Sequence, residues 1–313
     1  MNILNSENLC RDDRAACFTQ LFNLEVLFIM EWNWQEVVSA IKTVVNTIKK
    51  DYLIENDVLR DYVFEILEKE CIVLYYPIEE EKNNGFHIKK IVNNELEDFV
   101  YINTAKPVEL QVFTAAHEMG HVWNVAKKVW DALGYTGKIE LEKNLEEDIT
   151  NRFAAELLMP ENTFVRVFNQ KKMEMGLQDN LISIDDLLRI SVGLMNTFLV
   201  QYDAVRKRFY ETGIITVEGR KRLKEKNDEY KQKVQVYAKE QNSLLEKASN
   251  NKTIPGIREL IEEAEEKQSM SKIALEKIKA DFGIKQIEAE AEVLEILNAN
   301  GDNHGEKTSI SGL

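Results

Sequence analysis

Two of the four histidines in this chain of 313 residues stand four positions apart, at His117 and His121, with Glu118 directly after the first. On an α-helix, positions four apart lie on the same face, so both imidazoles could point at one metal ion. Glu118 would lie about 100° around the helix, where its carboxylate could reach a water at the metal without binding the metal itself. This H-E-x-x-H pattern therefore requires a helix and predicts a zinc site that hydrolyses amide bonds.

The residues around the pattern favour a helix. Pro107 suits a first helical turn, and the apolar positions that follow recur at spacings of three and four. Gly120 is a poor helix former, costing about 1 kcal/mol relative to alanine, but it lets a neighbouring segment approach closely. The apolar stripe consists of Val108, Val112, Ala115, Ala116, Met119 and Val122.

A second motif runs from Glu147 to Pro160. Together, F-T-x-x-H-E-x-G-H and E-x-x-x-N-x-F-A-A-x-L-L-M-P resemble the ImmA/IrrE family of zinc metallopeptidases. The resemblance implies that Glu147 is the third zinc ligand and that Asn151 faces the zinc site from behind the ligands. It covers about residues 70–215, and Thr150 departs from the alanine that is usual in the family.

Glu146 is the alternative third ligand. Position 147 shares its helix face with Asn151, whereas Glu146 shares a face with Thr150 and Phe153. This helical phase favours Glu147 without excluding Glu146. Two histidines and a carboxylate also suit non-haem iron, although the helical pattern favours zinc.

The remaining sequence predicts an α+β fold that is mainly helical and zincin-like. Helices are expected at 35–49, 58–67, 161–170 and 184–210. Strands at 71–76, 86–91 and 99–102 would form a small antiparallel sheet beside the H-E-x-x-H helix, with a turn at 83–85. The edge strand could pair with an extended substrate. His87, in the second strand, is expected to face solvent rather than to act as a further functional imidazole.

Four parts of the chain differ in composition. We expect N-terminal helices packing on the core over residues 1–69, a metallopeptidase domain over 70–215, a charged helical hairpin over 216–297 and a disordered tail over 298–313. The proposed hairpin seam includes Leu223, Tyr230, Val234, Tyr237, Ile257, Ile261, Ala264, Ile273, Ile278 and Phe282. A solvated charged helix without a partner fits this region equally well.

Charge and cysteine usage restrict the partners. A net charge of −14 argues against unaided binding to DNA or to an anionic membrane surface. The apolar stretch 17–30 is too short and too often interrupted by polar residues for a membrane span or a signal peptide. The three cysteines, an odd number without metal-pair spacing, indicate reduced thiols and a cytoplasmic location. They are Cys10, Cys17 and Cys71.

The resemblance also implies a substrate. Members of the family cut regulatory proteins, commonly helix-turn-helix repressors encoded nearby, in response to DNA damage or mobile-element signals. A repressor or an antitoxin-like protein is thus the implied substrate, and Zn²⁺ the implied cofactor. Two alternatives remain. One is a regulatory interaction protein with a slow or unused metal site, which docks a partner or a second copy through residues 220–297. The other is a hydrolase of small peptides.

Overall fold

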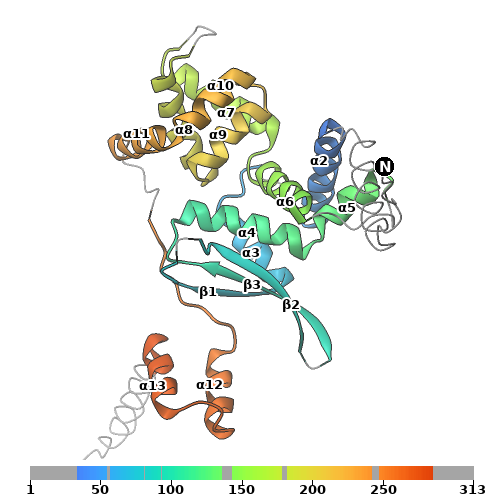
Figure 1. Cartoon of the computed structure of the whole chain (residues 1–313), viewed down its shortest axis with the longest axis vertical. Helices are drawn as coiled ribbons and strands as arrows, with labels where there is room; N and C mark the ends of the chain where they lie inside the picture. The colour runs from blue at the N-terminus through green and yellow to red at the C-terminus, as the bar shows by residue number, and fades with distance from the viewer. Residues whose placement is uncertain are drawn as a thin grey trace, which may run out of the picture.

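The computed structural model describes residues 34–54, 57–80, 82–92, 94–135, 143–177, 182–241 and 247–284. Its fold is α+β, mostly helical with one three-stranded sheet, as the sequence predicted (Figure 1). The N-terminal stretch with Cys10 and Cys17, the part of the expected helical hairpin beyond residue 284 and the C-terminal tail lie outside these ranges. None of the described helices is both long and apolar enough to cross a membrane.

The helices and strands follow in chain order. The strands are β1 (Ile72–Tyr76), β2 (Gly85–Val92) and β3 (Glu95–Asn103). The helices are α2 (Trp34–Asp51), α3 (Tyr62–Glu70), α4 (Val108–Val122), α5 (Val125–Ala132), α6 (Lys143–Leu158), α7 (Glu161–Glu174), α8 (Ile184–Phe198), α9 (Tyr202–Glu211), α10 (Val217–Glu225), α11 (Asn227–Glu240), α12 (Ile257–Glu266) and α13 (Lys272–Asp281). The H-E-x-x-H pattern thus lies on α4, and the second motif lies on α6.

The sheet is mixed, with the strand order β1-β3-β2. Strand β2 pairs antiparallel with β3, but β1 pairs parallel with β3, so the expectation of a fully antiparallel sheet was wrong. The turn at 83–85 does not join neighbouring strands. It carries the chain past the central position to the far edge, and β3 then returns beside β2 as a hairpin. Asn94 takes a left-handed conformation in that hairpin turn, which asparagine tolerates better than most residues.

The two sheet edges differ. Next to β1, the backbone of Thr253 exchanges two hydrogen bonds of 2.9 Å with Tyr75, so the segment 247–254 partly covers this edge. At the other edge, no strand within the described ranges pairs with the outer side of β2. The edge that remains open to an added strand is therefore β2.

Helices α3 and α4 pack on one face of the sheet, and α2, α5 and α6 pack beyond α4 (Figure 1). Val73, Val100 and Ile102 point from the sheet into this interface and are buried. Gly85 lets β2 approach α4 closely, because a Cβ atom there would lie 2.6 Å from both Thr114 Cγ2 and the Tyr101 carbonyl oxygen. This contact brings the start of β2 next to the helix that carries the histidines.

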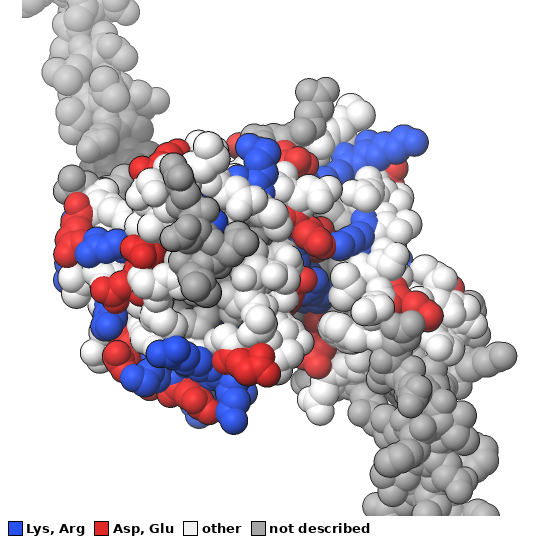
Figure 2. All heavy atoms as spheres, turned by 90° about the horizontal axis from the view of Figure 1, so that it is seen from above, with Lys and Arg blue, Asp and Glu red and all other residues white. Residues whose placement is uncertain are grey.

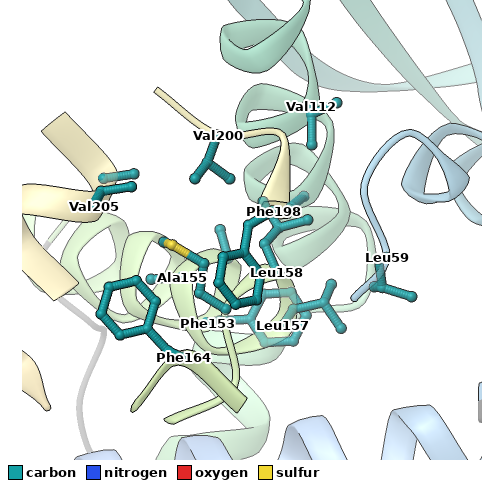
Figure 3. Close-up of a cluster of buried hydrophobic side chains, with 14 of the residues drawn as sticks. Leu59, Val112, Phe153, Ala155, Leu157, Leu158, Phe164, Phe198, Val200 and Val205 are labelled. Carbon is teal, nitrogen blue, oxygen red and sulfur yellow. The ribbon is translucent and has the colours of Figure 1, made fainter. Parts of the chain in front are cut away.

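The core is continuous from α2 through α6 to the helices that follow it. The F-A-A-x-L-L-M segment lies in the C-terminal half of α6. Its apolar side chains pack against apolar side chains of α7, α8 and α9 (Figure 3). The members drawn there include Phe153, Leu157, Leu158, Phe164, Phe198, Val200 and Val205. The second motif therefore combines two tasks: its first turns face the histidines, and its later turns build the core.

A buried ionic network ties α9 to α6. The guanidinium of Arg208 is fully buried, donates to the Met159 carbonyl oxygen at 2.9 Å and pairs with Glu156 at 2.5 Å. Glu211 accepts from Arg208 at 3.3 Å and also pairs with Arg152. Because each carboxylate has a cationic partner, the charges in this network compensate one another.

The C-terminal helices form two groups instead of one seam. Leu223, Tyr230 and Val234 of α10 and α11 belong to the main core, where α11 packs on α8. Helices α12 and α13 form a small separate cluster around Ile261 and Leu275, beyond the sheet (Figure 1). The predicted seam residues of α10 and α11 are buried, whereas Ile273 of α13, also predicted to lie in the seam, is 84% exposed. Within the described residues, the two groups do not form one hairpin core. Docking through residues 220–297 and the domain boundaries stay predictions.

Candidate metal centre

The two histidines of α4 converge. His117 and His121 lie one helical turn apart, with ring centroids separated by 4.9 Å. Their Nε2 atoms are 3.2 Å apart and therefore face the same point in space. Both side chains are about 16% exposed, so the site is shielded yet reachable from solvent.

Glu147 completes a set of three donor groups. Its carboxylate oxygens lie 3.2 Å from His117 Nε2 and 3.7 Å from His121 Nε2. One ligand atom from each of the three residues falls within 4.8 Å of the others. Bonds of about 2.0–2.1 Å in a tetrahedron separate neighbouring ligand atoms by about 3.3 Å. The spacing and the donor types fit a zinc ion with a fourth position left for water or substrate.

Both histidines have an acceptor behind them. His117 Nδ1 lies 3.1 Å from Asn151 Oδ1, and His121 Nδ1 lies 3.5 Å from Glu146 Oε1. A ring that donates from Nδ1 keeps the lone pair on Nε2 free for a metal. Glu146, the alternative third ligand, therefore lies on the outer side of His121, while Glu147 lies between the two Nε2 atoms.

Gly120 lets α6 approach α4. A Cβ atom at this position would lie 2.7 Å from Thr150 Cγ2 and 3.1 Å from Phe153 Cδ1. The close approach anticipated at Gly120 is thus made by side chains of α6. Thr150 also donates a hydrogen bond of 2.8 Å to the Glu146 carbonyl oxygen. The glycine brings the helix with the third donor within reach of the histidines.

Glu118 is buried, with only 6% of its surface exposed. Burial raises the pKa of its carboxyl to about 7, and the negative charge of Glu147 adds to this effect. Burial also lowers the pKa of His117, with a further contribution from neighbouring His121, and this favours the neutral imidazole that binds metals. The site thus holds a carboxyl group suited to exchanging protons near neutral pH beside two imidazoles suited to coordination.

His87 was expected to face solvent, but it does not. Its side chain is 13% exposed, its Nε2 pairs with Asp98, and its ring stacks on that of His121 at 6.4 Å between centroids. Its apolar neighbours in β2, Phe86 and Ile88, are more exposed, at 45% and 47%. Sequence reasoning also gave no signal for Asp98, whose position depends on the strand pairing.

Comparison with known proteins agrees with the geometry. Residues 69–210 match the model of the IrrE N-terminal-like domain, a peptidase family. No curated protein matches the chain. The matched range contains α4 and α6 in full, and with them every residue of the candidate centre. Residues 69–210 therefore form a metallopeptidase domain of the ImmA/IrrE family, and the resemblance read from the two motifs is confirmed.

Proposed function

We propose that this chain is a zinc-dependent endopeptidase in which His117, His121 and Glu147 hold the metal. The observation that carries the proposal is the convergence of two Nε2 atoms and one carboxylate at 3.2–3.7 Å. Two neutral nitrogen donors with one carboxylate suit zinc and match the donor set of hydrolytic zinc sites. The identity of the metal as zinc, and not iron, is part of the proposal.

When bound, the zinc ion supplies Lewis acidity, which polarises a carbonyl group and makes water nucleophilic near neutral pH. The protein's own groups then move the protons. Glu118 takes the proton of the attacking water and passes it to the amine that leaves. Asn151 holds the His117 imidazole in the orientation that keeps its Nε2 atom directed at the metal, and Glu146 places a negative charge beside Nδ1 of His121.

The substrate would bind along β2. This strand is the open edge of the sheet among the described residues, and His87 of β2 stacks on His121 at the metal centre. An extended segment added to β2 would make main-chain hydrogen bonds along its length and pass the metal. Such binding depends on main-chain hydrogen bonds, so it requires a segment that can adopt an extended conformation, such as a flexible region of a protein. We infer that the substrate is a regulatory protein, with a helix-turn-helix repressor as the first candidate from the family resemblance.

A cytoplasmic location is part of this proposal. Cys71, the cysteine within the described ranges, forms no disulfide there, and burial raises the pKa of its thiol to about 12. A neutral, unpaired thiol fits a reducing compartment.

The decisive variant is Glu118→Gln, which keeps the size of the side chain and removes the base. The zinc-loaded wild type should cut a repressor whose gene lies beside the gene of this protein. The variant should cut it about 10²–10⁴-fold more slowly. Zinc content must be equal in both proteins for this comparison. Equal cleavage rates would show that Glu118 is not the base. Unchanged biological output from an inactive variant would favour the interaction protein that does not cut.

A further inference from the structure

A second feature adjoins the metal centre, a pocket of about 340 Å³ between α4, α6, α9, α10 and the start of α2. Asn151 lines this pocket and also contacts His117, so the two sites share a residue. Phe113, another lining residue, lies one helical turn before His117 on α4. Asp148 of the lining directly follows Glu147. A chain bound across the metal centre would therefore reach the pocket with a neighbouring side chain.

The pocket is basic although the chain is acidic. Four cationic and two acidic side chains line it, a local balance of about +2 in a protein with a net charge of −14. On the face seen in Figure 2, by contrast, basic and acidic side chains are interspersed. One of the two acids, Glu211, is already paired with Arg152 and Arg208, and Arg206 pairs with Asp203 outside the lining. The positive charge available to an anionic group is therefore that of Lys207 and Arg220.

Two of the cationic side chains have unsatisfied donors. The Nε atoms of Arg152 and Arg206 are buried and have no hydrogen-bond partner within the described residues. Arg152 is 7% exposed, and the Arg206 side chain is 11% exposed. A buried guanidinium N–H without an acceptor has lost its water without gaining a hydrogen bond, which is unfavourable. An acceptor oxygen that enters this pocket would supply the missing hydrogen bond.

The other two cations, Lys207 and Arg220, stand at the exposed side of the pocket. The Arg220 guanidinium lies 4.6 Å above the ring of Tyr210, which holds it at the rim. Neither Lys207 nor Arg220 forms an ion pair within the described part of the chain. Trp34 and Phe113 supply aromatic surface in the same lining. The pocket therefore combines unpaired positive charge with walls that can pack against a short aliphatic stem.

We propose that this pocket is a substrate subsite that binds a carboxylate, either the side chain of an Asp or Glu near the scissile bond or the C-terminal carboxylate of a peptide. The inference rests on the proposed function, because it takes the bound chain to cross the metal centre. A carboxylate accepts charge-assisted hydrogen bonds from several guanidinium groups at once, which matches this lining. The volume is sufficient for one acidic side chain and its neighbouring backbone.

The buried part of the lining also has a structural task. Arg152 joins α6 to α9 through Glu211, so changing Arg152 would disturb the fold whether or not the pocket binds a ligand. Lys207 and Arg220 do not join helices in this way, so each can be replaced by a residue of opposite charge. The test protein is therefore Lys207→Glu/Arg220→Glu. The matched control is Arg222→Glu, an exposed cation on the same helix α10 that does not line the pocket.

The first arm measures binding without turnover. The zinc-loaded Glu118→Gln chain, immobilised, is incubated with a mixture of proteome-derived peptides, and the retained peptides are identified by mass spectrometry. We expect peptides with Asp or Glu to be enriched at least about fivefold over their neutral counterparts or, where the C-terminal carboxylate is the ligand, peptides with a free C-terminus to be enriched to the same degree over the same peptides with an amidated C-terminus. The double reversal should abolish this enrichment, and Arg222→Glu should keep it. Absence of both kinds of enrichment, or enrichment that survives the double reversal, would overturn the subsite.

The second arm exposes the same mixture to the active chain and maps the new termini. A preference for Asp or Glu at one fixed position from the cut identifies a side chain as the ligand. A fixed distance from the cut to the peptide end identifies the C-terminal carboxylate. Acidic peptides that bind but are never cut would support the subsite and refute the peptidase. Cleavage with neither an acidic preference nor a fixed distance to the peptide end would support the peptidase and refute the subsite.

Discussion

Replacing Gly120 by alanine should separate the two helices of the metal centre. The added Cβ would lie 2.7 Å from Thr150 Cγ2, about 0.7 Å closer than an ordinary contact of about 3.4 Å. Overpacking of this kind costs about 1–3 kcal/mol, and the better helix propensity of alanine returns up to about 1 kcal/mol. We therefore expect a net loss of about 1 kcal/mol in the free energy of unfolding.

The same change should weaken zinc binding, because Glu147 reaches the histidines only from an α6 that lies close to α4. Displacing a ligand by more than about 0.5 Å takes a metal site outside its working geometry. We expect zinc affinity to fall at least tenfold. Urea unfolding of the metal-free protein measures the first effect, and competition with a chromophoric chelator measures the second.

Gly193 of α8 provides the control, because the atoms nearest to a Cβ atom there belong to the flexible side chain of Lys171, the closest at 3.1 Å. Gly193→Ala should be neutral or slightly stabilising. Thr150→Ser removes the methyl group that Gly120→Ala would contact and should restore about 1 kcal/mol in the double variant. If Gly120→Ala matches Gly193→Ala in stability and keeps its zinc affinity, the close packing of α4 on α6 does not hold the site together.

Two further predictions concern hydrogen bonds. Asn151→Ala removes the acceptor behind His117, so chelator competition should show zinc affinity falling about 10–100-fold, whereas Asn151→Asp should retain most of it. Thr163→Val removes the hydrogen bond that, as the largest cause, lowers the pKa of Asp57. A lowered carboxyl pKa stabilises the fold above the unfolded value near 4 and loses that effect as pH falls through the folded value. Urea unfolding should therefore show a loss of about 1 kcal/mol at pH 7, moderated by solvent around Asp57, that shrinks towards pH 3. A loss that does not change with pH would exclude this explanation.

The helices of the site could be predicted because their signals are local. The spacing of His117 and His121 requires helical phase, and the same phase separates Glu147 from Glu146 on α6. The convergence of the two helices could not be read in the same way. It depends on Gly120 and Thr150, which meet across 30 positions of sequence (150 minus 120).

Three expectations failed for identifiable physical reasons. The strand pattern cannot tell which strands become neighbours, so the parallel pairing of β1 with β3 was missed. The expectation that His87 faces solvent failed because strand pairing and packing place its ring against that of His121 in the metal centre. The apolar stripe on α10 and α11 shows that one face is buried but not what covers it, which is α9 for α10 and α8 for α11 rather than the helices that follow. The basic pocket combines residues of several helices and had no sequence signal.

The central claim is that His117, His121 and Glu147 hold one metal ion. Elemental analysis of purified wild type, Glu147→Ala and Glu146→Ala tests it most directly, because the two glutamates are adjacent and similarly exposed. We predict about one zinc per chain in the wild type, most of it retained in Glu146→Ala and most of it lost in Glu147→Ala. Zinc retained in Glu147→Ala and lost in Glu146→Ala, or a wild type that binds no metal when zinc is supplied, would contradict the account.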